Sequence, residues 1–213
     1  NPLHEEQLEI VRMLGDVYAV NTIIDEDRNL VHATFGEVIA SHLQAVDFVR
    51  GFTEIAVGRK FHTVVTSSAG YPLDQTYYQT VKGMVTPLDI LEPGGTLIIA
   101  SECAEGIGSQ HYREAQGRLV SLGPDAFLDT LLAKQLADVD EWQTEMQLKP
   151  MRSGTVELYS TGLSDEDHQL TGVQRVSDLT AAIARSMAEH GDPAVAIIPE
   201  GPYVVPVSSS AGA

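Results

Sequence analysis

The polar residues with the clearest chemical potential lie in residues 66–84, TSSAGYPLDQTYYQTVKGM. This stretch follows the apolar pair Val64-Val65, opens with small residues and then favours a short helix. On that helix Gln79 and Lys82 are three residues apart, so the amide and the ammonium share one face. Ligands of open α/β sheets bind at loops that follow strands, and a cation there can hold a carboxylate or a developing oxyanion. Taken alone, the pair equally fits a solvated helix face, because Lys and Gln are common helix formers.

Aromatic residues surround the same predicted helix. Tyr71, Tyr77 and Tyr78 cluster there, and Tyr78 directly precedes Gln79. Most buried tyrosines belong to a core and have a satisfied hydroxyl, but Tyr78 could also line a substrate pocket. Trp142 is the single tryptophan of the chain, and its spacing indicates a packing residue.

Other motifs give weaker indications. Residues 101–109 contain Gly-Ile-Gly, but the spacing G-x-G-x-x-G is absent, which disfavours an ordinary nicotinamide oxidoreductase. This segment follows a predicted strand, so it either lines the cleft near Gly70 or is a plain connection. Cys103 is expected to be a small buried residue, and the seven histidines show no metal-ligand spacing. The acidic run 165–167 indicates a solvated loop or a helix start.

The periodicity of apolar residues predicts the elements that position these side chains. We expect an early hairpin and further short strands over residues 18–24, 29–34, 61–66, 96–101, 156–159, 173–176 and 194–199. We expect helices over residues 2–14, 36–57, 74–83, 86–91, 110–119, 124–136, 139–148 and 177–190. Asp74 is the expected N-cap of the helix with Lys82, Gly83 its expected end, and Pro150 the expected end of a later helix.

Strands separated by helices predict an α/β fold, a three-layer sandwich in which helices flank a mostly parallel mixed sheet. We expect one domain over residues 1–207, followed by a flexible tail over residues 208–213. The chain begins Asn-Pro rather than Met, so we expect an excised fragment.

The composition limits the classes of partner. The 213 residues carry a formal net charge of −17 with only 13 basic residues, which argues against binding nucleic acid or an anionic membrane surface. The acidity is best interpreted as an aid to solubility. A protein this acidic that binds an anionic substrate must place its few cations locally, which adds weight to Lys82. One cysteine excludes an intrachain disulfide, and no apolar run is long enough for a transmembrane helix. We expect no signal peptide and a cytoplasmic protein.

Several blocks together resemble one family. The motif GYPLDQ-x-x-YQ-x-VKGM resembles the C-terminal half of the nickel-dependent lactate racemases and related 2-hydroxyacid racemases and epimerases. The blocks NPLHEE, DFVRGF, EPGGTLIIASECAEGIGS, DEWQ and VAIIPEGPYVVPV resemble that family in the same order, so the resemblance covers nearly the whole chain.

The resemblance reverses the interpretation of the helix that carries Lys82. It implies that Gln79 and Lys82 face cofactor and substrate as catalytic and cofactor-binding residues. Lys82 would hold the substrate carboxylate or carbonyl oxygen, and Gln79 would hydrogen-bond the substrate hydroxyl or the cofactor. It also implies that Tyr78 lines the substrate pocket and that Trp142 lies near the active-site entrance.

The resemblance also implies what lies elsewhere in the protein. The family's acid–base histidines, cofactor-bearing lysine, nickel-ligating histidine and carboxylate-binding arginine belong to an N-terminal half, which would be this chain's partner. The implied cofactor of the full-length protein is a nickel-pincer nucleotide, and the implied substrate is a small 2-hydroxy acid. We therefore expect the fragment to be inactive alone and to hold neither cofactor nor metal. The alternative is a non-catalytic α/β binding or assembly module, although a scaffold has no need for Gln79 and Lys82 together.

Overall fold

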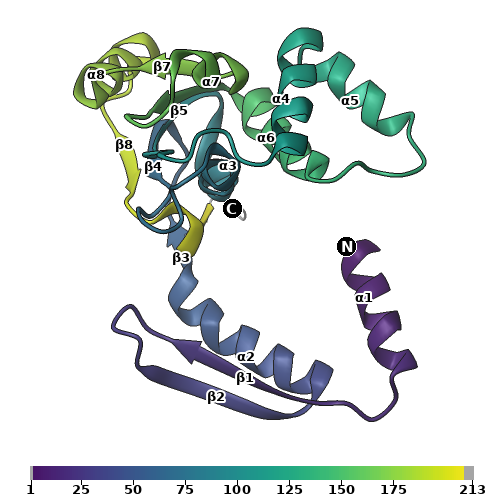
Figure 1. Cartoon of the computed structure of the whole chain (residues 1–213). Coiled ribbons are helices and arrows are strands. Elements are labelled where there is room, and N and C mark those ends of the chain that lie inside the picture. The colour runs from purple at the N-terminus through teal and green to yellow at the C-terminus, as the bar shows by residue number, and fades with distance from the viewer. Residues whose placement is uncertain (1, 209–213) are drawn as a thin grey trace. The chain divides into compact units, whose positions relative to one another are not determined.

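The computed structural model describes residues 2–208 and divides the chain into two compact units (Figure 1). One unit is Asn1–Glu54 and the other is Ile55–Ala213. The single domain predicted over residues 1–207 therefore contains two compact units, and its bounds stay a prediction. Of the predicted tail, residues 209–213 lie outside the described residues, and Ser208 is the last residue of a strand.

The first unit is a hairpin covered by a helix. The antiparallel strands pair from Tyr18 with Glu37 to Ile24 with Leu30, which confirms the predicted hairpin. On one face the His32 ring of the second strand stacks on Phe48 of the following helix, with ring centroids 4.0 Å apart. The elements are α1 (Pro2–Met13), β1 (Tyr18–Ile24), β2 (Leu30–Glu37) and α2 (Val38–Thr53).

The bounds of α2 differ from the sequence prediction. Glu37 caps the helix, because its carboxylate accepts hydrogen bonds from the N–H groups of Ile39 (3.1 Å) and Ala40 (2.9 Å). These bonds lower the pKa of Glu37. The helix ends at Thr53, so the prediction that it reaches residue 57 is wrong. The β-branched residues of EIAV instead form the short strand β3 (Glu54–Val57), whose sheet partner is β9 (Val205–Ser208).

The second unit contains the main sheet. Its strand order is β7-β6-β5-β4-β8, and every paired neighbour is parallel, which confirms the predicted α/β fold. The chain moves from β4 outward to β7 and then returns to the other side of β4, so the carboxyl ends of β4 and β8 flank the point where the winding reverses. The strands are β4 (Phe61–Ser67), β5 (Leu91–Ala100), β6 (Thr155–Tyr159), β7 (Gln174–Val176) and β8 (Val195–Ile198).

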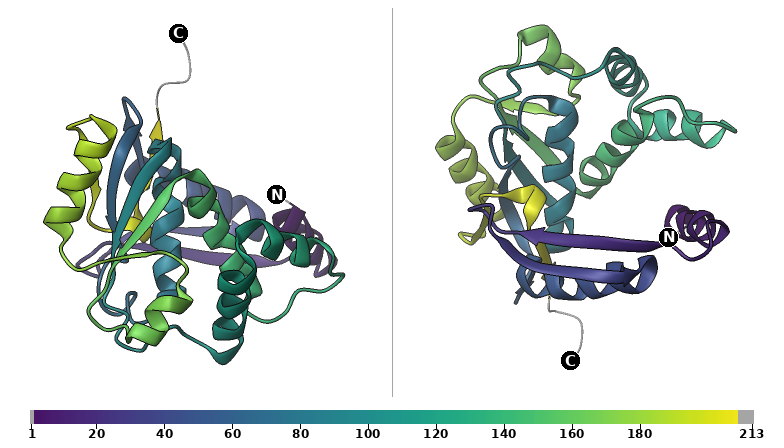
Figure 2. Two further views of the ribbon diagram at one scale, coloured as in Figure 1. Left: turned by 90° about the horizontal axis from the view of Figure 1, so that it is seen from above. Right: turned by 60° about the horizontal axis from the view of Figure 1, so that its bottom comes forward.

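Helices cover both faces of this sheet, as Figure 2 shows. Side chains that alternate along β4 and β5 serve opposite faces: Val64 and Leu97 join the core that includes α3, whereas Ile98 packs with Ala182 of α8. A third apolar cluster, centred on Phe127, joins α4, α5 and α6. The helices of this unit are α3 (Tyr77–Val85), η1 (Thr86–Ile90), α4 (Gln110–Leu122), α5 (Pro124–Leu132), α6 (Glu141–Ser153), α7 (Asp165–Leu170), α8 (Leu179–His190) and η2 (Gly201–Tyr203).

Three predicted helix ends are wrong. Thr76, not Asp74, precedes α3, and the Asp74 carboxylate accepts the Glu102 N–H at 3.3 Å instead. Gly83 lies inside α3, where a Cβ would come within 2.6 Å of the Ser67 carbonyl oxygen. The glycine therefore serves a close helix–strand contact rather than a helix end. Pro150 lies inside α6, which continues to Ser153, because a proline in a last turn removes only one helical donor.

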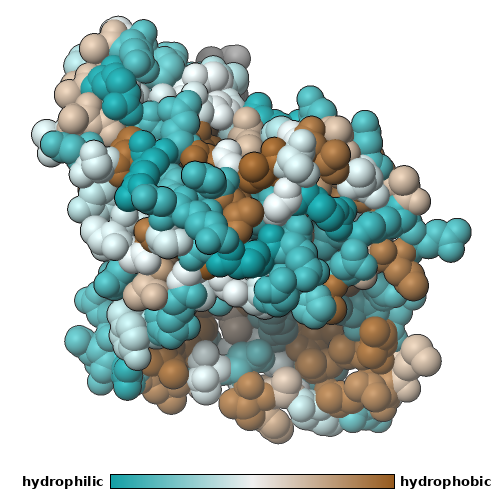
Figure 3. Space-filling model, turned by 45° about the horizontal axis from the view of Figure 1, so that its top comes forward, coloured by the Kyte–Doolittle hydropathy of each residue, from teal (hydrophilic) through white to brown (hydrophobic). Residues whose placement is uncertain are grey.

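The surface mixes hydrophilic residues with separate apolar patches, as one face shows in Figure 3. Exposed apolar side chains occur in both units, among them Phe35, Leu136 and Trp142. Within residues 2–208, no helix combines the length and the apolar character needed to cross a lipid bilayer.

Candidate active site

Helix α3 separates its residues by chemistry. One face is buried against the sheet, and the Tyr77 hydroxyl on that face donates to the Thr171 carbonyl at 3.1 Å. The other face carries Tyr78, Gln79 and Lys82, of which Tyr78 and Gln79 are half-buried and Lys82 is exposed. The helix is therefore amphipathic: one side packs in the core, and the residues available to a ligand lie on the opposite side. The fully buried residues of α3 are Tyr77, Thr80, Val81, Gly83 and Met84.

Tyr78 is the centre of a small aromatic group on this outer face. The Lys82 ammonium lies 5.9 Å from the centroid of the Tyr78 ring, within the range of a cation–π interaction. The Trp142 ring meets the Tyr78 ring nearly edge-on, with centroids 6.1 Å apart, and the Tyr112 ring also meets it nearly edge-on, with centroids 5.1 Å apart. The structure thus brings together Lys82, Tyr78 and Trp142, although Trp142 is 60 positions along the chain from Lys82.

Neither polar group of the predicted pair is used inside the described part of the chain. No carboxylate of residues 2–208 lies within 4.0 Å of the Lys82 ammonium, in a chain with 30 acidic residues. Likewise, the Gln79 side chain makes no hydrogen bond to another of these residues. Their hydrogen-bonding capacity therefore remains for a ligand or for a partner domain.

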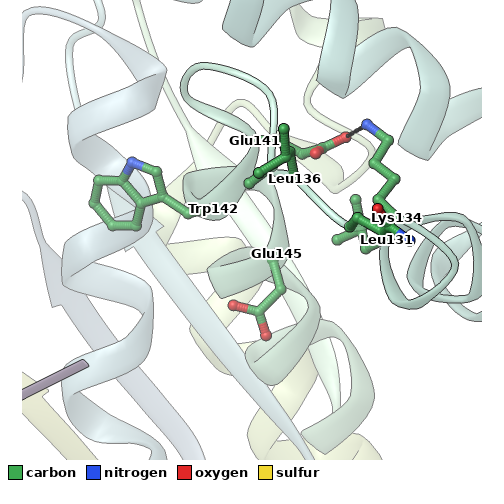
Figure 4. A pocket seen from close by; sticks show the side chains of 8 residues that line it. Leu131, Lys134, Leu136, Glu141, Trp142 and Glu145 are labelled. Carbon is green, nitrogen blue, oxygen red and sulfur yellow. Dashed lines mark hydrogen bonds and ion pairs between the residues drawn. The ribbon is translucent and has the colours of Figure 1, made fainter. Parts of the chain in front are cut away.

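A buried charge network positions Trp142. The preceding residue, Glu141, is 2% exposed, and its carboxylate lies 2.7 Å from both Lys134 and Arg118. The N–H of Asp138 donates to the same carboxylate at 3.2 Å. Figure 4 shows the Lys134–Glu141 pair beside a cavity of about 290 Å³ and the Trp142 ring extending away from that pair. The network fixes the start of α6, and so it sets where the indole meets Tyr78.

The electrostatics of Glu141 support this structural role. Burial raises the pKa of the Glu141 carboxyl, but hydrogen bonds from Lys134, the Asp138 N–H and Arg118 outweigh it and lower the pKa overall. The carboxylate is therefore charged in the folded protein at neutral pH, as the network requires.

The loop after β5 is bound to the start of α3. The Tyr77 and Tyr78 N–H groups donate to the Gly106 and Ile107 carbonyls at 2.9 and 3.0 Å, so these helix N-terminal donors are satisfied by the chain itself. The Glu105 N–H in turn donates to the Gln75 carbonyl at 2.8 Å. Of the two possibilities left open for residues 101–109, the structure supports the one in which they border the same site as the 68–76 loop. Cys103, in the loop 101–109, is fully buried, as predicted.

A second cavity, of about 490 Å³, borders the outer face of α3 at its N-terminal end. The Ser109 hydroxyl on its wall donates to the Asp140 carboxylate at 2.5 Å. Partial burial and the nearby Asp140 raise the pKa of Tyr78, so the phenol is neutral at physiological pH and can both donate and accept. We name this space the Tyr78 cavity, and its lining residues are Thr76, Tyr78, Glu105, Gly108, Ser109 and Asp140.

Sequence reasoning found Tyr78 but missed Glu105, Ser109 and Asp140. Glu105 and Ser109 belong to the loop 101–109, which the sequence indicated only as a segment, whereas Asp140 precedes α6 and is distant in the chain. The side-chain hydrogen bond from Ser109 to Asp140 brings the loop and the turn before α6 together, which only the tertiary structure shows. No group of three or more His, Cys, Asp and Glu side chains within residues 2–208 is arranged to hold a metal ion.

Comparison with known proteins gives two relatives of the whole chain. It is 27% identical over 219 residues to a lactate racemase of Thermoanaerobacterium thermosaccharolyticum, across 96% of this chain and 48% of the relative. It is 25% identical over 210 residues to a lactate racemase of Lactiplantibacillus plantarum, with the same two coverages. The chain thus spans about half the length of the curated relatives it matches.

Solved structures show the same fold. The lactate racemase apoprotein from T. thermosaccharolyticum matches with a TM-score of 0.86 at 23% identity, over 97% of this chain and 49% of that one. A protein from Thermotoga maritima matches with a TM-score of 0.61 at 9% identity, over 94% of this chain and 51% of that one. The family model of the lactate racemase C-terminal domain matches residues 58–206, nearly all of the second compact unit. This chain belongs to the lactate racemase C-terminal domain family.

Proposed function

We propose that this chain forms the C-terminal wall of the active-site cleft of a 2-hydroxyacid racemase or epimerase. One observation carries the proposal: Lys82 lies exposed over the Tyr78 ring, with no carboxylate partner in residues 2–208. A cation left unpaired in a strongly acidic chain is suited to an anionic substrate. The edge of Trp142 against Tyr78 gives that cation an aromatic border.

Each residue of this face has a definite task in the proposed reaction. Inversion at C2 of a 2-hydroxy acid turns the hydroxyl oxygen into a carbonyl oxygen and back, while the carboxylate stays anionic. Lys82 would hold the carboxylate or that carbonyl oxygen, because an ammonium stabilises either one electrostatically. Gln79 would hydrogen-bond the same oxygen in both forms, since its amide can donate and accept. Tyr78 and Trp142 would border the bound substrate and limit its contact with water.

We further propose that the full-length protein uses a nickel-pincer nucleotide, which would accept a hydride from C2 and return it to either face. The free ammonium of Lys82 and the free amide of Gln79 fit an anionic cofactor as well as an anionic substrate. The family resemblance assigns the nickel ligand and the acid–base histidines to an N-terminal half, and this chain spans about half the length of its curated relatives. The chain by itself is therefore proposed to be inactive. A cytoplasmic location, expected from the sequence, stays a prediction.

The test uses the full-length parent protein, expressed with nickel and with the enzymes that make the cofactor. Loss of optical activity is followed for L-lactate and for a panel of larger 2-hydroxy acids, with the present chain alone as a comparison. Racemisation by the parent and none by the chain alone is the expected result. A parent that binds no nickel and turns over no substrate would overturn the proposal in favour of a non-catalytic module that keeps the fold.

A further inference from the structure

The Tyr78 cavity adjoins the surface proposed to bind substrate. Tyr78 belongs to both, because its ring contacts Lys82 and its side chain lines the cavity. The cavity volume, about 490 Å³, is in the range of small-molecule sites. Lactate carries only a methyl group beyond C2, so lactate held by Lys82 would leave this space to water. A longer substrate held in the same way could extend a chain of further carbons into it.

The lining of the Tyr78 cavity is polar and anionic. Glu105 is exposed, and its carboxylate has no partner among the described residues. Asp140 uses one carboxylate oxygen to accept from Ser109 and keeps the other. Thr76 adds a hydroxyl that makes no capping bond to α3. No cation lines the cavity, and Gly108 contributes no side chain.

This lining distinguishes between classes of substrate tail. Two carboxylates repel a second carboxylate, so a dicarboxylic hydroxy acid is disfavoured. An alkyl or aryl tail would desolvate these polar groups without replacing their hydrogen bonds with water. A tail with several hydroxyl groups supplies donors for Glu105 and Asp140, and acceptors for the hydroxyls of Thr76 and Ser109.

We propose that the substrate of this site is a polyhydroxylated 2-hydroxy acid, an aldonic acid of about six carbons, whose tail hydroxyls bind in the Tyr78 cavity. The proposal rests on the function proposed above and names its substrate class. Lys82 holds the carboxylate end, and Glu105 and Asp140 accept hydrogen bonds from the distal hydroxyls.

The experiment measures kcat/KM of the nickel-loaded, full-length parent for exchange of the C2 hydrogen. The probes are gluconate, lactate and 2-hydroxyhexanoate, which has the same number of carbons as gluconate but no distal hydroxyl. We expect gluconate to exceed both others by at least about tenfold, since a site built of hydrogen-bond acceptors discriminates against analogues that lack the donors. Equal or better turnover of lactate or 2-hydroxyhexanoate overturns the substrate class but leaves the racemase function intact. No turnover of gluconate by a parent that binds nickel likewise overturns the substrate class, whereas no turnover of any probe together with no bound nickel overturns the proposed function itself, and with it this inference.

A substitution at Glu105 tests whether the Tyr78 cavity causes the preference for gluconate. Glu105→Ala is expected to lower the ratio of gluconate to lactate kcat/KM by about tenfold, because it removes one acceptor from the lining. Asp129→Asn is the matched control, since Asp129 is an exposed carboxylate of α5 that lines none of the site. It removes the same charge and is expected to leave the ratio unchanged. A ratio unchanged in Glu105→Ala, in a parent that prefers gluconate, would exclude Glu105 from recognition of the tail and overturn the assignment.

Discussion

Two lysines of the second unit, Lys82 and Lys134, have opposite environments. The Lys134 ammonium lies 2.5 Å from Asp138 and 2.7 Å from Glu141, so it is fully paired. The Lys82 ammonium instead lies over the Tyr78 ring, 5.9 Å from its centroid. Within residues 2–208 several other cations also have no carboxylate within 4.0 Å, namely Arg12, Arg28, Lys60 and Lys149. Lys82 differs from these four because its ammonium lies over an aromatic ring. The comparison teaches that Lys134 holds the start of α6 in place, whereas the ammonium of Lys82, over the Tyr78 ring, stays accessible to a ligand.

The largest expected effect tests Lys82, the lysine without a carboxylate partner in residues 2–208. Lys82→Ala in the full-length protein should lower kcat by about 10²–10³-fold, the usual cost of losing a group that stabilises a developing charge. The far-UV circular dichroism spectrum and the urea midpoint should stay unchanged, because the side chain is exposed. Lys149→Ala removes an exposed lysine of α6 as a control for charge alone. Activity within a few-fold of the parent would show that Lys82 has no catalytic role.

A smaller effect is expected at Gln79. Gln79→Ala should lower kcat/KM by about 10–10²-fold, because one hydrogen bond to a charged or polarised oxygen is lost. Comparison of kcat with KM separates the two possible partners of the amide: a fall in kcat indicates the reacting oxygen, whereas a rise in KM alone indicates ground-state binding. Unchanged kcat and KM would leave Lys82 as the single polar group of α3 in the reaction.

Breaking the ion pair of Lys134 with Glu141 should lower the stability of the fold, in contrast to the loss of activity expected at Lys82. Glu141→Gln removes the charge that joins Lys134 and Arg118, and the free energy of unfolding should fall by about 1–3 kcal/mol. Urea denaturation can follow this through Trp142, the only tryptophan, which directly follows the substitution. Asp129→Asn again serves as the control. An unchanged unfolding midpoint would mean that the network contributes nothing to stability and would remove the contrast between the two lysines.

The smallest expected effect is a pH dependence of the same stability. Burial, followed by the nearby Arg175, lowers the pKa of His168 from its ordinary value of 6.5, and Glu141 is lowered from 4.5. For both groups the unfolded chain takes up protons more readily than the folded chain. Stability is therefore complete above each ordinary value and falls as pH decreases below it. The urea midpoint should decline first below about pH 6.5 and more steeply below about pH 4.5.

His168→Gln separates the two parts of that profile. It should remove the upper step and leave the lower one, because Gln does not titrate and Glu141 is unchanged. A midpoint that stays flat from pH 8 to pH 5 in the parent protein would contradict the role given to His168.

Much of the fold follows from local pattern. The apolar runs of β4, β5 and β8 and the amphipathic period of α8 are long enough to identify these elements without tertiary information. Most of the incorrect ends share a physical cause, because a tertiary contact overrode a local signal; Pro150 is the exception, since a proline in a last turn removes only one helical donor. Gly83 normally indicates a helix end, yet its lack of a side chain serves the approach of α3 to Ser67. Residues 54–57 continue an apolar helix pattern, yet they pair with a strand near the C-terminus.

The site residues also divide into those that local sequence could identify and those that only tertiary contacts bring together. Gln79 and Lys82 lie on one short helix, so their spacing and the resemblance were enough to single them out, and their roles stay predictions. Trp142 reaches Tyr78 only through the packing of α6 beside α3, and the sequence alone indicated no such contact. Glu105 and Asp140 were beyond local reasoning because hydrogen bonds between loops determine where they lie.

The glycine contact of α3 has a consequence for how such a domain can diversify. Gly83 lets the backbone of α3 rest directly on the end of β4, so the location of neighbouring Lys82 depends on main-chain atoms rather than on replaceable side chains. Glu105, Ser109 and Asp140 lie instead on loops and at the start of α6, where substitution is tolerated more readily. Under the proposed function, the domain thus separates an anchor held by main-chain contacts from a wall carried on loops, and new substrate ranges would arise by mutation of the wall while the anchor stays in place.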